Sequence, residues 1–215
     1  MNTIKNSLKL NLEYKLNKLS EETVHKNPFK QFGDWFNQVL KLELKEPTAM
    51  VLATADKKAR PSARVVLMKE ISSEGITFYT NYNSRKGEEL KQNPSAALLF
   101  YWTELERQVR IEGNIKKVSR QESVKYFNSR PFGSRIAAWI SEQSEIIPNR
   151  EYLEKRFTEL EKNFSDGKIS LPPNWGGFRL FPNYFEFWQG KENRMHDRIC
   201  YRKIKSKWKI SRLAP

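Results

Sequence analysis

The feature of this sequence that most constrains its fold is a series of short segments with β-type composition, separated by turn signals. Branched and aromatic residues gather in brief runs, whereas Asp56-Lys57-Lys58 and Ser72-Ser73-Glu74-Gly75 have the composition of tight turns. The predicted strands cover residues 48–55, 61–71, 76–81, 96–102, 108–118, 177–181, 184–189, 198–203 and 207–211. Connections this short join antiparallel neighbours, because parallel strands need long crossovers.

Helical segments are predicted between the groups of strands. Asn27 and Pro28 suit the cap and the first position of a helix whose apolar residues recur at helical spacing. Ser119 and Glu122 form a capping-box pattern that predicts a helix to about residue 128, and Pro131 ends it. Further helices are predicted at residues 84–92, 134–141 and 151–164.

This order of elements predicts an α+β protein, an antiparallel barrel with helices packed outside. Residues 1–27 are polar and rich in Lys and Asn, so we expect a mobile N-terminal arm. The 215-residue chain has no repeat and no convincing linker, so residues 28–215 are expected to form a single domain.

The charge of the chain favours anionic partners. There are 39 Lys and Arg against 25 Asp and Glu, a formal net charge of +14 at pH 7, and such a field attracts nucleic acid and phosphorylated metabolites alike. No apolar run is long enough for a membrane span and no secretory signal is recognisable, so we expect a soluble cytoplasmic protein. One Cys (Cys200) and two His (His25 and His196) are too few for a usual zinc site, so no metal is expected.

Two segments near the first strands carry cations at spacings that suit anions. Arg64 and Lys69 end an apolar strand segment, and period-two alternation predicts that they face opposite sides of the sheet. The segment Asn83-Ser84-Arg85-Lys86 follows a strand and opens a helix, where unpaired backbone N–H groups and two cations suit a phosphate. Each has an ordinary alternative, a strand with snorkelling ends or a plain capped helix with solvated charges.

A third segment places Tyr126, Arg130 and Ser134 at intervals of four residues. This spacing places the three side chains on one helical face, which predicts a second phosphate-binding site. Pro131, however, requires the helix to break between them. The alternative is a helix end whose Arg is favoured by the macrodipole.

A fourth segment alternates Arg194, His196 and Arg198 along the chain. In an extended conformation the three side chains project to one side, where they need an anionic partner. A single His is more often structural, yet the two flanking Arg favour a functional interpretation.

Taken together, these segments resemble the pyridoxine/pyridoxamine 5′-phosphate oxidases, from about Pro28 to the terminal Arg212-Leu213-Ala214-Pro215. The motifs that occur in the family's order are Pro47-Thr48-Ala49-Met50, Arg64 to Lys69, Phe78-Tyr79-Thr80-Asn81, Ser84-Arg85-Lys86, Glu106-Arg107-Gln108-Val109, Tyr126 to Pro131, Trp175-Gly176-Gly177-Phe178-Arg179, Phe187-Trp188-Gln189-Gly190 and Arg194 to Arg198.

The resemblance implies a homodimeric split β-barrel that holds flavin mononucleotide (FMN) at the subunit interface. It implies oxidation of pyridoxine and pyridoxamine 5′-phosphates to pyridoxal 5′-phosphate by hydride transfer to the flavin, which oxygen reoxidises to give hydrogen peroxide. The residues implied for FMN are Arg64, Val65, Val66, Leu67, Met68, Lys69, Tyr79, Thr80, Arg85, Lys86, Gln108, Gln143, Ser144, Trp188 and Arg198. Those implied for the substrate are Lys69, Tyr126, Arg130 and Ser134 at its phosphate, and Arg194, Met195 and His196 at its ring, with Arg194 and His196 as catalytic residues.

Two positions depart from the family's pattern. The family's arm carries an Arg three residues before a Tyr, whereas here Asn11 stands three residues before Tyr14, so the charge of that Arg is absent. Glu46 stands where an Asp is expected before Pro47, so the carboxylate is kept with a longer reach.

Two rival functions remain from the sequence. The first is another FMN-binding split-barrel protein, such as a flavin reductase or an oxidase for a different phosphorylated amine or alcohol, which would have no need of the substrate-side residues. The second is a nucleic-acid-binding module, suggested by the net charge and the many aromatic residues, but no known binding motif supports it. We therefore expect small-molecule partners and neither nucleic acid nor membrane.

Overall fold

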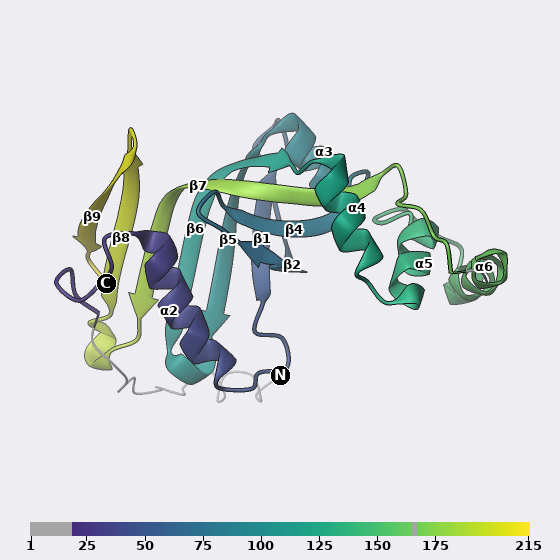
Figure 1. Ribbon diagram of the computed structural model, residues 1–215. Coiled ribbons are helices and arrows are strands. Elements are labelled where there is room, and N and C mark those ends of the chain that lie inside the picture. The colour runs from purple at the N-terminus through teal and green to yellow at the C-terminus, as the bar shows by residue number, and fades with distance from the viewer. Residues whose placement is uncertain (1–18, 165–166) are drawn as a thin grey trace, which may run out of the picture. The chain divides into compact units, whose positions relative to one another are not determined.

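The computed structural model describes residues 19–164 and 167–215. Its helices are α2 (Pro28–Leu40), α3 (Arg85–Gln92), α4 (Arg120–Asn128), α5 (Phe132–Ile140) and α6 (Arg150–Asn163) (Figure 1). Its strands are β1 (Ala49–Ala55), β2 (Pro61–Leu67), β3 (Glu70–Ile71), β4 (Ile76–Asn81), β5 (Ser95–Trp102), β6 (Arg107–Lys117), β7 (Trp175–Gln189), β8 (Asp197–Ile204) and β9 (Lys207–Leu213), with 3-10 turns η1 (Thr103–Leu105) and η2 (Glu192–Arg194). The strand order is β2-β1-β5-β6-β7-β4-β3, and β8 pairs with β7 and β9.

The chain forms two compact units. Unit 1 consists of the described part of Met1–Pro47 together with Leu99–Ile111 and Tyr184–Pro215, and unit 2 consists of Thr48–Leu98 and Glu112–Asn183. The expectation of one domain over residues 28–215 stays a prediction. Among the described residues, none of the helices is both long and apolar enough to cross a membrane.

Unit 1 is held together by aromatic packing between α2 and the strands. Phe32 and Trp35 on α2 are buried, because the apolar residues of this helix recur on one face. The Phe32 ring meets Phe100 at 5.1 Å and the Trp35 ring meets Phe187 at 5.2 Å, in edge-on geometries that aromatic pairs prefer. In the same unit, β8 pairs antiparallel with β7 from Gln189↔Asp197 to Tyr184↔Arg202.

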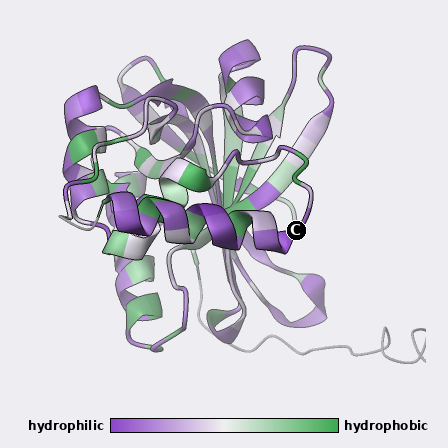
Figure 2. Cartoon of the chain, turned by 90° about the vertical axis from the view of Figure 1, so that its right-hand side faces the viewer, coloured by the Kyte–Doolittle hydropathy of each residue, from purple (hydrophilic) through white to green (hydrophobic). Residues whose placement is uncertain are grey.

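Unit 2 combines antiparallel strands with a helical cluster. β1 pairs with β2, and β4 pairs with the first part of β7, from Asn81↔Trp175 to Ile76↔Leu180. The helical core packs Phe127 of α4 and Ile136 of α5 with Trp175. α6 has no fully buried residue, and in Figure 2 its exposed face is mostly hydrophilic.

The sequence predicted the starts of α2 and α4 correctly, whereas α5 begins at Phe132 rather than at residue 134. The Asn27 side chain accepts a hydrogen bond from the backbone N–H of Phe29, as a cap should. Ser119 and Glu122 form the predicted capping box in both directions. These signals are local, so they do not depend on tertiary contacts.

The boundaries of three predicted strands were wrong. Residues 61–71 form β2 and β3 rather than one strand, because the chain changes its pairing partner between them. Residues 177–181 and 184–189 belong to the single strand β7, which continues through Pro182. Proline has a dihedral angle compatible with a strand and lacks only a donor, so it does not have to end one.

Gly113 on β6 allows close contact between backbones within unit 2. A Cβ atom at this position would lie 2.1 Å from the carbonyl oxygen of Phe181 and 2.9 Å from the Cα of Pro182. Backbone atoms cannot move aside as a flexible side chain can, so β6 requires glycine here.

We predict that Gly113→Ala lowers the free energy of unfolding by roughly 1–3 kcal/mol, the usual cost of overpacking. The control is Gly33→Ala in α2, where a Cβ meets nothing within 4 Å. That change should be neutral or stabilising by about 0.5–1 kcal/mol, since alanine favours helix interiors. Urea denaturation of both variants checks this, and equal stability of the two would contradict it.

Candidate active site

The main candidate site is a cavity of about 940 Å³ that lies within unit 2. We call it the cationic cavity. The residues that line it come from β2 and the link after it, β4, α3, α4, α5 and their connection, the segment after α5 and the start of β7: Ser62, Ala63, Arg64, Val65, Val66, Leu67, Lys69, Tyr79, Thr80, Asn81, Arg85, Lys86, Tyr126, Arg130, Pro131, Ser134, Ala137, Ala138, Ser141, Gln143, Ser144 and Trp175. Its volume is in the range of small-molecule and cofactor sites.

Arg64 and Lys69 both line this cavity, as do residues 65–67 between them, so the lining does not test the prediction that the two side chains face opposite sides. The predicted alternation does not reach Lys69, because β2 ends at Leu67. The backbone N–H of Met68 donates to Thr48 O and that of Lys69 to Thr77 O, each at 2.9 Å, so the chain passes from one partner strand to another. Met68 itself is buried and does not line the cavity.

Lys86 is a buried cation at the start of α3, 8% exposed. Its Nζ donates to Gln143 Oε1 at 2.7 Å and to Thr80 Oγ1 and Ser84 Oγ at 3.1 Å. Burial and, to a lesser extent, the nearby charge of Arg64 lower the pKa of Lys86 to about 8, against the opposing effect of Glu89. Such a cation gains from an anion that replaces its lost hydration.

The N-terminus of α3 is joined to the segment after α5. Ser84 is the N-cap residue, but its hydroxyl donates to Asn81 O at 2.6 Å instead of capping the helix. The backbone N–H of Arg85 donates to Ser144 Oγ at 3.2 Å. Gln143 and Ser144, which only the resemblance indicated, are thus brought to the same place as Lys86.

Glu89 is a site residue that the sequence interpretation missed. This buried carboxylate on α3 accepts hydrogen bonds from Arg64 Nη2 at 3.2 Å and from Arg85 Nε at 2.9 Å. Thr54 and Ser62 also donate to it, each at 2.5 Å. The available signal was the spacing of Arg85 and Glu89, four residues apart on a predicted helix.

A second part of the cavity wall is aromatic. The Tyr79 and Tyr126 rings stack at 3.9 Å, and Trp175, missing from the predicted site, stacks on Tyr79 at 5.6 Å. The Arg130 guanidinium lies 4.8 Å from the centre of the Trp175 ring. Burial, together with the charges of Glu122 and Glu70, raises the pKa of Tyr79 to about 12, so this phenol stays neutral.

Arg130 carries a buried donor without an acceptor. Within residues 19–164 and 167–215, no hydrogen-bond partner is present for its Nη1, and burial lowers the pKa of the guanidinium. A buried unsatisfied donor is costly, which favours an anionic ligand here.

Tyr126, Arg130 and Ser134 do not share one helical face, contrary to the prediction. α4 ends at Asn128 and Pro131 is the N-cap residue of α5, so the three lie on two helices and their connection. They nevertheless line the same cavity, because the connection turns the chain around it.

The remaining predicted residues lie in unit 1: Gln108 on β6, Trp188 on β7, Arg194, Met195 and His196 at and after η2, and Arg198 on β8. Arg194 has a positive φ of 60° within η2, so the predicted extended row of Arg194, His196 and Arg198 is wrong. The strand begins only at Asp197.

The His196 ring is held by its neighbours in unit 1. Its Nδ1 accepts a hydrogen bond from the backbone N–H of Lys191 at 3.1 Å, which requires the proton to be on Nε2. Burial and the charge of Arg194 both lower the pKa of His196, which favours the neutral ring. The Trp188 ring lies 4.6 Å away.

Arg198 is bound to a buried carboxylate in the same unit. Glu186, 2% exposed, accepts from Arg198 Nε at 2.8 Å and from Arg110 Nη2 at 2.6 Å. Burial raises the pKa of Glu186, but the two arginines outweigh this effect and lower it overall. Asn11 and Tyr14 lie outside the described residues, and Glu46 is exposed.

Comparison with solved structures identifies the fold. The chain superposes on PhzG from Burkholderia lata 383, solved with tetrahydrophenazine-1-carboxylic acid, with a TM-score of 0.87 and 30% identity over 93% of this chain and 99% of that one. A pyridoxamine 5′-phosphate oxidase-related, FMN binding protein from Nostoc punctiforme gives a TM-score of 0.70 at 16% identity, covering 92% and 99% of the two chains. The predicted fold class, an α+β antiparallel split β-barrel with surrounding helices, is confirmed.

Comparison with known sequences agrees with this. Residues 36–164 match the family described as pyridoxamine 5′-phosphate oxidase, and residues 175–215 match the pyridoxine 5′-phosphate oxidase C-terminal dimerisation region. The pyridoxine/pyridoxamine 5′-phosphate oxidase of Cyanothece sp. is 52% identical over 206 residues, and that of Burkholderia thailandensis is 52% identical over 209 residues, each covering 96% of this chain and 97% of the relative. The chain therefore belongs to the pyridoxamine 5′-phosphate oxidase family.

Proposed function

We propose that this protein is an FMN-dependent oxidase that converts pyridoxine 5′-phosphate and pyridoxamine 5′-phosphate to pyridoxal 5′-phosphate. Oxygen is the electron acceptor, hydrogen peroxide is released, and the amine also yields ammonia. The observation that carries the proposal is one cavity lined by two groups of cations with separate supporting contacts. A cofactor phosphate and a substrate phosphate would each occupy one group.

The residues of the first group fit an FMN phosphate. Arg64 and Arg85 are linked through Glu89, and Lys86 is buried beside Arg64, so like charges are gathered where a dianion would relieve their repulsion. When bound, FMN supplies the redox chemistry, and the protein supplies position and electrostatics.

The second group fits the substrate phosphate. The unsatisfied Nη1 of Arg130 would donate to a phosphate oxygen, and Lys69, Tyr126 and Ser134 line the same cavity. Gripping the phosphate away from the reacting carbon orients the substrate without taking part in the bond changes.

The residues of unit 1 complete the proposal. We assign Gln108, Trp188 and Arg198 to FMN, and Arg194, Met195 and His196 to the substrate ring, as the resemblance implies. The neutral His196, with its proton on Nε2, would act there as a hydrogen-bond donor. We further propose a homodimer, supported by the match to a C-terminal dimerisation region, and a cytoplasmic location, supported by the single, buried Cys200.

A second candidate is a phenazine-type carboxylate as substrate, favoured by the likeness to PhzG. An anionic carboxylate would also suit Arg130. The higher identity to the pyridoxine/pyridoxamine 5′-phosphate oxidases favours the B6 phosphates.

We predict that the purified protein is yellow and that it forms pyridoxal 5′-phosphate from either phosphate in an oxygen-dependent reaction. The visible spectrum and an assay of peroxide and pyridoxal 5′-phosphate check this. Bound flavin without turnover of either phosphate would exclude the proposed substrates, and a colourless protein that FMN does not reconstitute would exclude the cofactor.

We predict that Arg130→Met raises KM for the phosphorylated substrate and lowers kcat/KM on the order of 10- to 100-fold, the value of one charged hydrogen bond. FMN content should be unchanged. Arg135→Met is the matched control, since Arg135 is on α5 and does not line the cavity. Equal kinetics for the two variants would remove Arg130 from the substrate site.

We predict that FMN binding weakens as pH rises above about 8. The pKa of Lys86 is about 8 without an anion, and a bound phosphate favours its charged form, so binding above this pH requires uptake of a proton. The dissociation constant should rise by up to about tenfold per pH unit until the pKa of the complex is reached.

Titrations of FMN fluorescence between pH 7 and 9.5 measure this dependence. Lys86→Met should bind more weakly with a flatter profile, whereas Lys91→Met, at an exposed position on the same helix, should follow the unsubstituted protein. A flat profile for the unsubstituted protein would contradict the assignment of Lys86.

A further inference from the structure

Glu89 is a buried carboxylate that joins two cations of the cationic cavity. It is 5% exposed, and its two oxygens take different partners: Oε1 accepts from Arg85 Nε and Oε2 accepts from Arg64 Nη2. The two arginines come from different elements, since Arg64 is on β2 and Arg85 is on α3. One carboxylate therefore fixes the distance between a strand cation and a helix cation.

Two hydroxyl groups complete the arrangement around Arg64. Thr54 and Ser62 each donate to Glu89 Oε2 and each accept from the Arg64 guanidinium. Arg64 Nη1 also donates to the backbone oxygen of Leu52 at 3.2 Å. Both terminal nitrogens of Arg64 are thereby directed toward protein acceptors, and the guanidinium plane is fixed.

Glu89 remains ionised in this setting. Burial by itself raises the pKa of Glu89, but hydrogen bonds from Ser62, Thr54, Arg85 and Arg64 outweigh it and lower the pKa to about 2. The carboxylate therefore provides a full negative charge throughout the neutral pH range.

We propose that Glu89 is a positioning residue: it fixes the directions of Arg64 and Arg85 and supplies the negative charge that balances Arg64 beside Lys86. It does not itself touch the bound phosphate. This inference rests on the proposed binding of FMN in the cationic cavity.

The charge balance around Lys86 follows from its neighbours. Arg64 on β2 faces it with a positive charge and Glu89 on α3 with a negative one, while Thr80 on β4 and Gln143 after α5 offer neutral acceptors. Without Glu89, the repulsion from Arg64 would act on Lys86 unopposed. Lys86 would then lose its proton at a lower pH, and the site would lose a cation that a phosphate requires.

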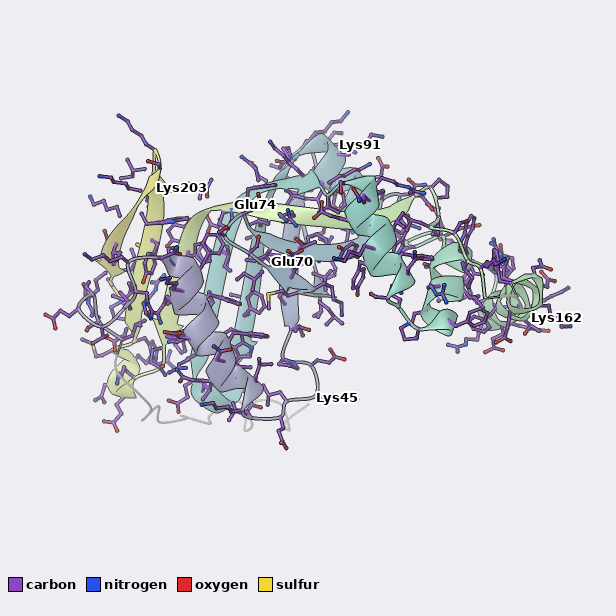
Figure 3. The ribbon with its side chains drawn as sticks, viewed as in Figure 1. Lys45, Glu70, Glu74, Lys91, Lys162 and Lys203 are labelled. Carbon is purple, nitrogen blue, oxygen red and sulfur yellow. The ribbon has the colours of Figure 1, made fainter. Side chains whose placement is uncertain are left out.

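The test compares Glu89→Gln, Glu89→Asp and the control Glu88→Gln. Glu88 is the adjacent residue on α3, and its side chain is 46% exposed and pairs only loosely with Lys91 at 3.8 Å. Lys91 extends outward from this helix (Figure 3), so the control removes a charge from the solvent side. Each protein is titrated with FMN and with riboflavin, which lacks the phosphate, between pH 6.5 and 9.5.

For Glu89→Gln we expect the dissociation constant of FMN to rise roughly three- to tenfold at pH 8 and less at pH 6.5, with the pH midpoint moved to lower pH. Riboflavin binding should not change. Glu89→Asp keeps the charge but not the reach to both arginines, so it should weaken FMN binding without moving the midpoint. Glu88→Gln should match the unsubstituted protein in every measurement.

Three results would overturn the inference: unchanged FMN binding in Glu89→Gln, equal losses for FMN and riboflavin, or a midpoint in Glu89→Asp that moves as far as in Glu89→Gln. The second would show that Glu89 only stabilises the fold. If the unsubstituted protein binds FMN no better than riboflavin, the proposed cofactor site fails instead, so the two failures are distinguishable.

Discussion

Repulsion between like charges is the constraint on which the candidate site depends, because Arg64, Arg85 and Lys86 line one cavity and cannot be brought together without compensation. The fold provides it in two forms. Glu89 gives a negative charge shared between the two arginines, and neutral oxygens of Thr80, Ser84 and Gln143 surround the Lys86 ammonium. The pKa of Lys86 nevertheless stays lowered, mainly by burial and further by the charge of Arg64, so a bound anion would stabilise its charged form.

The part of the cavity around Arg130 is arranged differently. Arg130 is placed over the Trp175 ring, and the stacked rings of Tyr79 and Tyr126 extend the same wall. Aromatic faces attract a cation weakly, so they hold the guanidinium in place without using up its donors. The Nη1 of Arg130 has no hydrogen-bond partner among the described residues, and a ligand that accepts a hydrogen bond from it would remove this energetic cost.

Much of the local structure was predictable from the sequence. Asn27 and the Ser119–Glu122 pair act through hydrogen bonds to residues two or three positions away, so their patterns predict helix starts reliably. The conformation of residues next to the ends of strands was harder to predict. Period-two alternation could not be applied to Lys69, because the strand ends two residues earlier, and Arg194 was expected to be extended although it adopts a left-handed turn conformation.

Some residues of the candidate site could be predicted from the sequence and others could not. The cations stand in recognisable sequence motifs, whereas Glu89 and Trp175 are identified only by their contacts with residues distant in the sequence.

The change of partner between Met68 and Lys69 has a consequence for how the cavity responds to substitution. The backbone N–H of Met68 donates to Thr48, next to β1, and that of Lys69 donates to Thr77 on β4, so this short link is bonded to two different strands. A one-residue deletion in β2 would invert its faces and also draw the Lys69 ammonium away from the opening. The length of this link therefore determines where Lys69 lies along the cavity wall, whichever side chains the link itself carries.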